Sequence, residues 1–293
     1  MQKTFPAAEL AAAVGAAPVR RTAVRGAGYG TNTAKWRVEL DDRRRVFVKL
    51  ALDDLAAGWL RDEAHVYTAG PAPFLPAFVA WHDEAGQTLL VIEDLADAYW
   101  PPPWSPEQIS AVLATLDLLH ATNPPANLPS LEEARSRLEG WPDVAADPGP
   151  LLSTGLCSPE WLATALPALA TASQECVLAG NAFLHLDVRS DNLCFHGKRV
   201  LLVDWNLACV GDPLIDTVAW VPSLRLEGGP EPWVLVPDSG GLSALLAGFF
   251  ASRAGLPPPA TAPTVREFQR RQAVVALEWA ARELGLPPPR LSA

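Results

Sequence analysis

Polar side chains interrupt an otherwise apolar stretch, FLHLDVRSDNLCFHGKRVLLVDWN, at residues 183–206. Asp187 and Asn192 lie in its first half, and Asp204 follows directly on the apolar run of residues 200–203. A buried carboxylate is costly unless a cation, a metal or a set of donors compensates its charge. The stretch therefore predicts either structural ion pairs or a bound ligand.

Two interpretations of these side chains stay open at this point. Magnesium prefers oxygen ligands and phosphate partners, so Asn192 and Asp204 on neighbouring strand ends could hold it against a nucleotide. Asp187 would then remain available to accept a proton. In the structural alternative, Asp187 and Asn192 cap a turn and Asp204 pairs with Arg189.

A site for a triphosphate also needs a cation for the phosphates and a group that fixes this cation. Lys49 ends the alternating strand VFVKL, and Glu63 lies on the following predicted helix, from which it could reach Lys49. Either residue alone would be typical of a solvated surface. Together with the acidic stretch they favour a nucleotide site.

Two further segments could contribute to nucleotide binding. The glycines Gly26, Gly28 and Gly30 stand between the first two predicted strands and could let the backbone approach phosphates. Their spacing matches neither the P-loop nor the dinucleotide fingerprint. The run LLVIEDL, which ends in Glu93 and Asp94, would supply a crossing strand whose backbone an adenine could use.

Strand patterns come first along the chain and helical patterns later. Alternation predicts three strands near 22–25, 34–40 and 45–50, a helix over 52–70, and a hairpin over 78–95. Helical segments follow near 106–121, 131–138, 159–178, 241–254 and 265–284, with proline-rich connections. This order predicts an α+β protein with a small antiparallel-sheet lobe over residues 1–95 and a larger, mainly helical lobe over 96–293.

Composition excludes several classes of protein. The 293 residues are 49% hydrophobic, enough for a sizeable core, and the net charge of −10 disfavours a nucleic-acid surface. The four cysteines lack metal-ligand spacing, and the five histidines are too dispersed for a metal cluster. No GxSxG or HExxH motif is present. With no targeting segment and no membrane-spanning run, we expect a cytoplasmic protein.

The ordered motifs resemble the aminoglycoside phosphotransferase and choline kinase-like group, small-molecule relatives of the protein kinases. The likeness covers about residues 20–220 and rests on HxDxxxxN at 185–192, on VLLVDW, on GDPLID, and on Lys49 and Glu63. It implies a two-lobed protein-kinase-like fold. By this resemblance Asp187 is the catalytic base, and Asn192 and Asp204 are magnesium ligands. Lys49 with Glu63 holds the nucleotide phosphates, and His185 and Asp216 support the catalytic segment.

Two departures from the family pattern affect the catalytic segment. Many relatives have glycine where this chain has Leu186, and their segment often reads DLHPGN where this one reads DVRSDN. The second departure puts Arg189 near the expected γ-phosphate, and we count Arg189 with Asp187 among the candidate catalytic residues. Whether Arg189 aids transfer or pairs with Asp191 stays open.

The predicted activity is transfer of the γ-phosphoryl group of ATP or GTP, with Mg²⁺, to a hydroxyl group of a small molecule. Aromatic and acidic residues of the helical lobe would suit a cationic amino sugar or amine: Trp100, Trp104, Trp205, Trp220, Trp233, Trp279, Glu227, Glu231, Asp238 and Glu278. A catalytically inactive nucleotide-binding module is the alternative. We expect a monomer or weak homodimer with no nucleic-acid or membrane partner.

Overall fold

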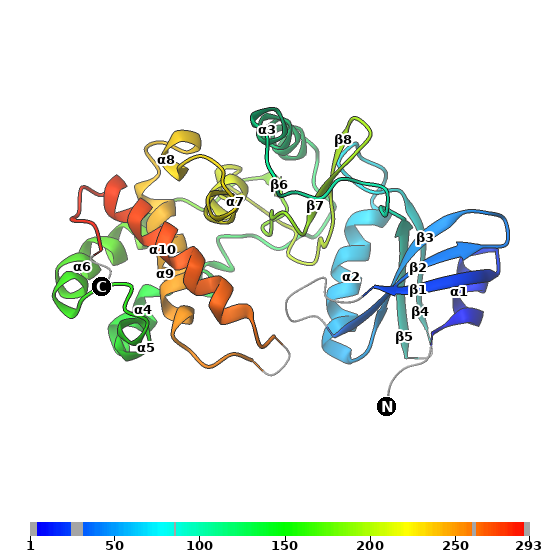
Figure 1. The fold of residues 1–293 in the computed structure, drawn as a ribbon, viewed down its shortest axis with the longest axis horizontal. Helices are drawn as coiled ribbons and strands as arrows, with labels where there is room; N and C mark the ends of the chain where they lie inside the picture. The colour runs from blue at the N-terminus through cyan, green and yellow to red at the C-terminus, as the bar shows by residue number, and fades with distance from the viewer. Residues whose placement is uncertain (1–4, 25–31, 85, 260–261, 290–293) are drawn as a thin grey trace. The chain divides into compact units, whose positions relative to one another are not determined.

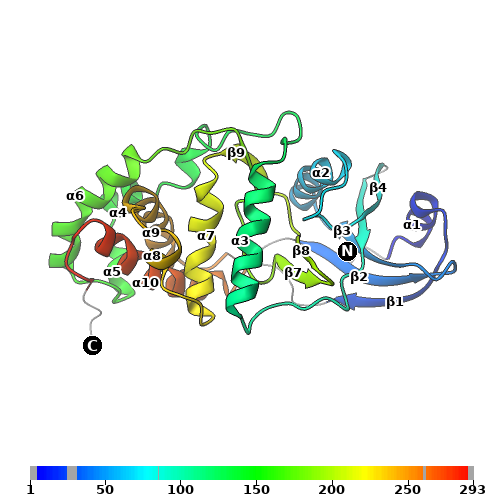
Figure 2. The ribbon, with the colours of Figure 1, turned by 90° about the horizontal axis from the view of Figure 1, so that it is seen from above.

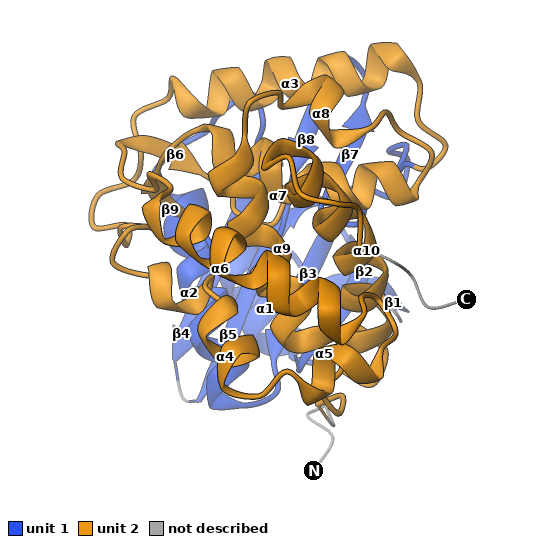
Figure 3. Cartoon of the chain, turned by 90° about the vertical axis from the view of Figure 1, so that its left-hand side faces the viewer, with its two compact units in different colours: residues 1–101, 190–208 blue, residues 102–189, 209–293 orange. Residues whose placement is uncertain are grey.

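The computed structural model describes residues 5–24, 32–84, 86–259 and 262–289. The chain forms two compact units (Figure 3). Unit 1 comprises residues 1–101 and 190–208, and unit 2 comprises residues 102–189 and 209–293. Residues 96–101 and 190–208 thus pack within unit 1, although they follow residue 95. The domain boundary expected after residue 95 stays a prediction.

Unit 1 is built on a five-stranded antiparallel sheet with the order β1-β2-β3-β5-β4 (Figure 1). Its strands are β1 (Pro18–Val24), β2 (Thr33–Leu40), β3 (Arg45–Ala51), β4 (Phe78–Glu84) and β5 (Gln87–Glu93). Period-two alternation predicts such strands because successive side chains point to opposite faces of the sheet. The three-strand meander and the hairpin expected from the sequence are confirmed.

A helix covers each face of this sheet. On one face, Leu10 of α1 (Ala7–Val14) packs in a buried cluster with Val38, Val46 and Val48. The alternate residues of these strands, such as Lys49, point to the opposite face of the sheet, which α2 (Asp54–Thr68) covers (Figure 1). The sequence predicted one helix in this unit. Helix α1 was not predicted, because this short alanine-rich segment is helical largely through the burial of Leu10.

A two-stranded hairpin from later in the chain completes unit 1. It consists of β7 (Leu193–His196) and β8 (Arg199–Leu202), which pair in antiparallel register. Cys194 and Leu201 pack with Leu95 in a small buried cluster. Phe195 exchanges backbone hydrogen bonds with Tyr99 at 2.8 and 2.9 Å. These contacts explain why residues 190–208 belong to unit 1.

Unit 2 is mainly helical (Figure 2). Its helices are α3 (Pro106–His120), α4 (Trp141–Ala146), α5 (Gly149–Ser153), α6 (Pro159–Glu175), α7 (Leu214–Leu226), α8 (Pro232–Leu235), α9 (Gly240–Ala254) and α10 (Val265–Glu283). A short two-stranded sheet joins β6 (Ala182–Leu184) to β9 (Cys209–Gly211). The predicted α+β fold class is confirmed.

Helix α9 lies at the centre of unit 2 and contacts α4, α5, α6, α7 and α10. Trp141 of α4 is fully buried against Gly248 of α9, and its indole nitrogen donates to the carbonyl of Ala244 at 2.7 Å. The small side chains of α9 let its neighbours approach closely. None of the helices in the described ranges has the length and apolar character needed to cross a membrane.

One helical prediction for unit 2 was wrong, and one long helix was missed. The helix expected over 131–138 is a turn with a 3₁₀ segment, Arg135–Arg137, because Arg135 binds backbone carbonyls outside it, including that of Cys176 at 2.6 Å. Helix α7 was not expected. Eight of its 13 residues are buried and Pro222 lies inside it, so it lacks the one-sided pattern by which a helix is recognised.

Candidate active site

A buried lysine is the centre of the polar cluster in unit 1. Lys49 of β3 donates to both carboxylate oxygens of Glu63 at 2.8 Å and also to Oδ1 of Asp204. The carboxylate of Glu63 in turn accepts from the backbone nitrogen of Asp204 at 3.2 Å. Three residues far apart in the sequence are thus tied together, as predicted for Lys49 and Glu63.

Helix α2 places Glu63 under the sheet. The helix begins after Asp53, whose side chain caps it by accepting from Ala56 N at 2.8 Å. Glu63 shares the buried stripe of this helix with apolar residues: Ala56, Leu60, Ala64 and Tyr67. A carboxylate among such neighbours requires a cation, and Lys49, itself 3% exposed, supplies it.

Burial and charge act against each other in this cluster. Burial by itself lowers the pKa of Lys49, but the carboxylates of Asp204 and Glu63 outweigh it and raise that pKa well above its ordinary value. For Glu63 burial is the largest influence and raises its pKa, although Lys49 opposes the shift. Lys49 therefore stays a cation throughout the neutral range and can serve as a fixed positive charge.

The β7–β8 hairpin places the two predicted metal ligands, Asn192 and Asp204, at the same end of its two strands. Asn192 precedes β7 and Asp204 follows β8, and Val203 N donates to the backbone carbonyl of Asn192 at 2.9 Å. Within the described residues no group of three or more His, Cys, Asp or Glu side chains could hold a metal. One amide and one partly exposed carboxylate suit Mg²⁺, which keeps water and phosphate oxygens as its other ligands.

Asp204 has an unusual backbone conformation. Its φ of 64° lies in the left-handed region, which non-glycine residues adopt at a cost of about 1–2 kcal/mol. Its backbone nitrogen is held by Glu63 and its side chain by Lys49. These contacts hold the strained residue where its carboxylate lies between the hairpin and β3.

In unit 2 a buried aspartate fixes the backbone of the HxD segment. Asp216 of α7 accepts from His185 N at 3.0 Å and from Leu186 N at 2.6 Å, and His120 Nε2 of α3 lies 3.0 Å from the same carboxylate. The nitrogen of Asp187 donates to Nδ1 of His185 at 3.2 Å. His120 was not predicted as a partner of Asp216, because 96 residues separate the two and no motif links them.

Leu186 shows what the departure from the family pattern means structurally. Its φ is 63°, in the region that glycine adopts without a steric penalty. A leucine at this position is held there by the Asp216 hydrogen bond and by packing against the apolar cluster that contains Leu184 and Leu131. The chain thus keeps the left-handed turn before Asp187 without a glycine.

The two candidate catalytic residues form an ion pair. Nε of Arg189 lies 3.2 Å from Oδ1 of Asp187, and the guanidinium carbon lies 5.7 Å from the ring centre of Phe268 on α10. The side chain of Asp204 binds Lys49, and its pairing with Arg189 in the structural alternative stays a prediction, as does that of Arg189 with Asp191. The ion pair places Arg189 beside the carboxylate of Asp187.

Comparison with known proteins identifies the family. Residues 23–234 match the phosphotransferase enzyme family, which is more than half of the chain. The chain belongs to this family. A search of curated proteins found no match.

Solved structures of similar fold include other members of this phosphotransferase family and related kinases. A choline/ethanolamine kinase family protein from Mesorhizobium loti has a TM-score of 0.58 at 13% identity, covering 91% of each chain. Aminoglycoside phosphotransferase APH(4)-Ia, in a ternary complex with ADP and hygromycin B, has a TM-score of 0.56 at 14% identity, covering 96% of this chain and 97% of that one. Macrolide 2'-phosphotransferase MphH from Brachybacterium faecium has a TM-score of 0.52 at 15% identity, covering 96% and 98%. At these identities the likeness shows a shared fold.

The glycine segment and Glu93 of this phosphotransferase were both predicted to contact the nucleotide. Gly26, Gly28 and Gly30 lie outside the described residues. The side chain of Glu93 accepts from Ala77 N at 3.0 Å and pairs with Arg199 and His196 at 3.0 and 3.1 Å. Burial tends to raise its pKa, but these donors outweigh burial and lower it. The Glu93 side chain thus has a structural role, and adenine binding at its backbone stays a prediction.

Half of the six tryptophans expected to bind an acceptor lie in the core of this phosphotransferase. Trp205, Trp220 and Trp279 are fully buried. Several other residues of the set have partners within the protein. Trp104 donates to Glu227 at 2.8 Å, Arg282 stacks on Trp233 at 4.5 Å, and Arg225 pairs with Glu231 at 2.8 Å. Trp205, Trp220 and Trp279 are therefore closed to an acceptor, and acceptor binding by the other residues of this set stays a prediction.

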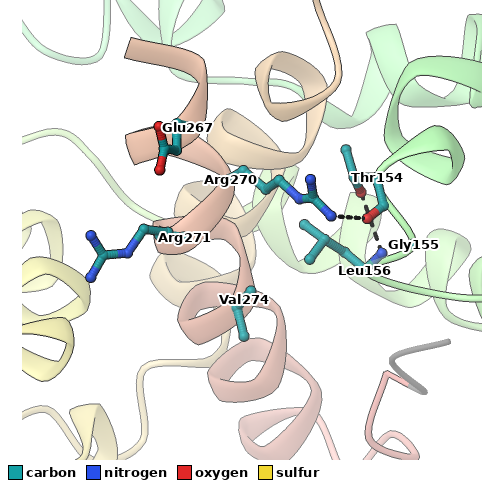
Figure 4. Close-up of a pocket in the computed structure, with 7 residues that line it drawn as sticks. All are labelled: Thr154, Gly155, Leu156, Glu267, Arg270, Arg271 and Val274. Atoms are coloured by element: carbon teal, nitrogen blue, oxygen red, sulfur yellow. Dashed lines mark hydrogen bonds between the residues drawn. The ribbon is translucent and has the colours of Figure 1, made fainter. Parts of the chain in front are cut away.

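A hollow of about 440 Å³ lies in unit 2 between α10 and the turn after α5 (Figure 4). It is lined by Thr154, Gly155, Leu156, Glu267, Arg270, Arg271 and Val274. Arg270 donates to the carbonyl of Thr154 at 2.5 Å, and Figure 4 shows the side chain of Arg271 pointing away from that turn. The polar groups of the hollow do not converge on one point, so we assign no ligand to it.

Proposed function

We propose that this member of the phosphotransferase family transfers the γ-phosphoryl group of ATP, or of GTP, to a hydroxyl group of a small molecule. The observation that carries the proposal is the buried Lys49, which is held between Glu63 and Asp204. A fixed cation beside a part-exposed carboxylate is the arrangement that triphosphate and its metal require. Family membership supports the same activity.

In this proposal Lys49 binds phosphate oxygens and Glu63 keeps its ammonium group in place. The side chains of Asn192 and Asp204 would hold Mg²⁺, which would neutralise charge on the phosphate oxygens. The Asp204 side chain is 28% exposed, against 4% for that of Lys49, so its carboxylate is accessible to a metal ion.

Asp187 orients the acceptor hydroxyl and takes its proton. The hydroxyl oxygen forms a new bond to the γ-phosphorus, the bond from that phosphorus to the β,γ-bridging oxygen breaks, and the nucleoside diphosphate leaves. The Asp216 hydrogen bonds to His185 and Leu186 keep the backbone before Asp187 fixed. Arg189 holds the carboxylate of Asp187 in one orientation until substrate arrives.

A cationic amino sugar or amine is the acceptor class that we propose. The net charge of −10 favours such a partner. Proteins of similar fold include one solved with hygromycin B and one from a choline/ethanolamine kinase family. A cytoplasmic location, a monomer or weak homodimer, and the lack of nucleic-acid and membrane partners stay predictions.

The decisive experiment measures ATP and GTP consumption with Mg²⁺ across four acceptor classes: aminoglycosides, choline-like amines, homoserine-like amino acids and sugars. We expect turnover with at least one class, and none with Asp204→Ala. Nucleotide binding without turnover for any acceptor would favour the inactive binding module. Unchanged turnover in Asp204→Ala would show that the metal assignment is wrong.

A further inference from the structure

Lys35 of β2 stands directly opposite Lys49 of β3 in the antiparallel register. Residues opposite each other in such a pair project from the same face, with Cβ atoms about 4.5–5.5 Å apart. That face is the one covered by α2, where Lys49 meets Glu63. Lys35 is half-buried there, so its stem runs alongside that of Lys49.

The charges around Lys35 are those of the nucleotide cluster. Burial is the main influence and lowers the pKa of Lys35; the carboxylate of Asp204 raises it, and the ammonium of Lys49 lowers it further. Glu63 and Asp191 also raise it. All these groups belong to unit 1. Two like charges placed opposite each other destabilise a sheet, and here the three carboxylates offset this repulsion.

Composition makes the pair more unusual. Only four of the 23 Lys and Arg residues are lysines: Lys3, Lys35, Lys49 and Lys198. The chain therefore uses arginine almost everywhere a cation is needed, yet two of its four lysines face each other on neighbouring strands. Lysine differs from arginine in carrying a compact charge on a flexible stem, which suits a phosphate oxygen approached from a sheet.

The charge balance changes when a metal and nucleotide enter. Without them, the three carboxylates Glu63, Asp204 and Asp191 exceed the two ammonium groups by one charge. With Mg²⁺ on Asp204, the positive charges exceed the negative ones by one, and a polyanion is then needed nearby. A triphosphate supplies it.

We propose that Lys35 is a second phosphate-binding residue of the nucleotide site, beside Lys49. This inference rests on the proposed function. Lys35 lies on β2, where no sequence motif indicates a binding residue. Its role is to bind the phosphates rather than the adenosine part of the ligand.

The test compares Lys35→Met with wild type by isothermal titration calorimetry, using Mg²⁺ with β,γ-imido-ATP and, separately, adenosine. Methionine keeps an unbranched apolar stem and removes the charge. We expect imido-ATP to bind about 10- to 100-fold more weakly, the range for one charge-assisted hydrogen bond. Adenosine affinity should change less than about twofold. Lys35→Arg should recover part of the lost affinity, because it keeps the charge.

Lys198→Met is the matched control, because Lys198 is exposed in the β7–β8 turn of the same unit. It should bind both ligands as wild type does. Unchanged imido-ATP affinity in Lys35→Met, or an equal loss for adenosine and imido-ATP, would overturn the inference and leave the proposed function standing. Failure of the wild-type protein to bind either β,γ-imido-ATP or β,γ-imido-GTP with Mg²⁺ would remove both.

Discussion

Asp187 is held by two separate sets of contacts in unit 2, through its backbone to His185 and through its carboxylate to Arg189. The first set orients the backbone, and the second orients the side chain. Because Asp187 is assigned to the proton, and Asn192 and Asp204 to the metal, we expect substitution of Asp187 to separate proton acceptance from nucleotide binding.

Asp187→Asn should abolish most phosphoryl transfer and leave nucleotide binding intact. Asparagine keeps the shape but cannot accept the proton, and general-base catalysis contributes roughly 10²- to 10⁴-fold. The affinity for ATP with Mg²⁺ and the rate of acceptor phosphorylation are measured on one preparation. Asp117→Asn, an exposed aspartate of α3, should match wild type in both. Transfer retained in Asp187→Asn would place the base elsewhere.

Leu186 allows a test of backbone strain, because its φ of 63° penalises every residue with a Cβ. Leu186→Ala keeps the strain and loses packing, whereas Leu186→Gly loses packing but relieves about 1–2 kcal/mol. We expect the glycine variant to be the more stable of the two by about 1 kcal/mol, after the entropy cost of glycine is subtracted. The free energy of unfolding in denaturant gives the comparison.

Leu116, in the buried stripe of α3, is the control position for the expected order of stability of the alanine and glycine variants. In a helix glycine is about 1 kcal/mol less favourable than alanine, so Leu116→Gly should be the less stable variant there. The same order at both positions would mean that residue 186 does not adopt the left-handed conformation in solution.

At the scale of the elements, two helical glycines have opposite surroundings. A Cβ on Gly248 of α9 would lie 2.7 Å from the ring of Trp141, whereas a Cβ on Gly58 of α2 would meet nothing within 4 Å. Helix propensity favours alanine at both sites by about 1 kcal/mol. Only packing distinguishes them.

Gly58→Ala should therefore raise the free energy of unfolding by up to about 1 kcal/mol. Gly248→Ala should lower it by about 1–3 kcal/mol, because overpacking against Trp141 outweighs the gain in propensity. Thermal and urea unfolding of the two variants measure both changes. A stabilised Gly248→Ala protein would contradict the close α4–α9 contact.

Glu93 links three elements of unit 1, since it binds the loop before β4, the end of β7 through His196 and the start of β8 through Arg199. Burial opposes its charge, yet the donors lower its folded pKa below the ordinary 4.5. A carboxyl with a lowered pKa contributes stability above its unfolded pKa and loses it as the pH falls through the folded value.

Glu93→Gln should accordingly melt below wild type at pH 7. The gap in melting temperature should begin to narrow as the pH falls below about 4.5, where Glu93 of the unfolded chain takes up a proton, and should be lost below the folded pKa, where Glu93 of the folded protein is also neutral. Melting curves from pH 7 to pH 3 measure it. A difference in melting temperature between wild type and Glu93→Gln that does not change with pH would mean that the charge of the Glu93 carboxylate contributes nothing to stability.

For the whole molecule, each unit has a buried cluster of its own, with Leu10, Val46 and Val48 in unit 1 and Trp141, Leu169 and Leu277 in unit 2. The residues assigned to nucleotide and metal lie in unit 1, and Asp187 and Arg189 lie in unit 2. Nucleotide and metal should therefore stabilise the protein without any acceptor.

ATP with Mg²⁺ at 100 times its dissociation constant should add about 2.7 kcal/mol to the free energy of unfolding. Removing the metal with EDTA at the same ATP concentration should abolish most of this gain, because the triphosphate then faces Asp204 without a cation between them. Differential scanning calorimetry with and without EDTA measures the loss. Equal stabilisation in EDTA would show that Asn192 and Asp204 do not bind nucleotide through a metal.

The amino-acid sequence by itself determined the strands of unit 1 and most of the longer helices, whereas the roles assigned to the residues of the candidate site stay predictions. Alternation with period two and the helix boundary residues act locally, so they can be read from neighbours in the chain. The pairing of Lys49 with Glu63 was also predictable. A lysine on a strand followed by a glutamate on the next helix leaves few other ways to compensate a buried carboxylate.

Only the tertiary structure decided which polar groups meet across long separations. His120 and Arg135 bind partners that lie 96 and 41 residues away, and no local pattern specifies such contacts. The same is true of Lys35, whose place beside Lys49 follows from strand register, and of Glu93, whose carboxylate is held by Arg199. Tryptophans expected to bind an acceptor became core for a related reason: the sequence records how apolar a residue is, but burial depends on which elements pack over it.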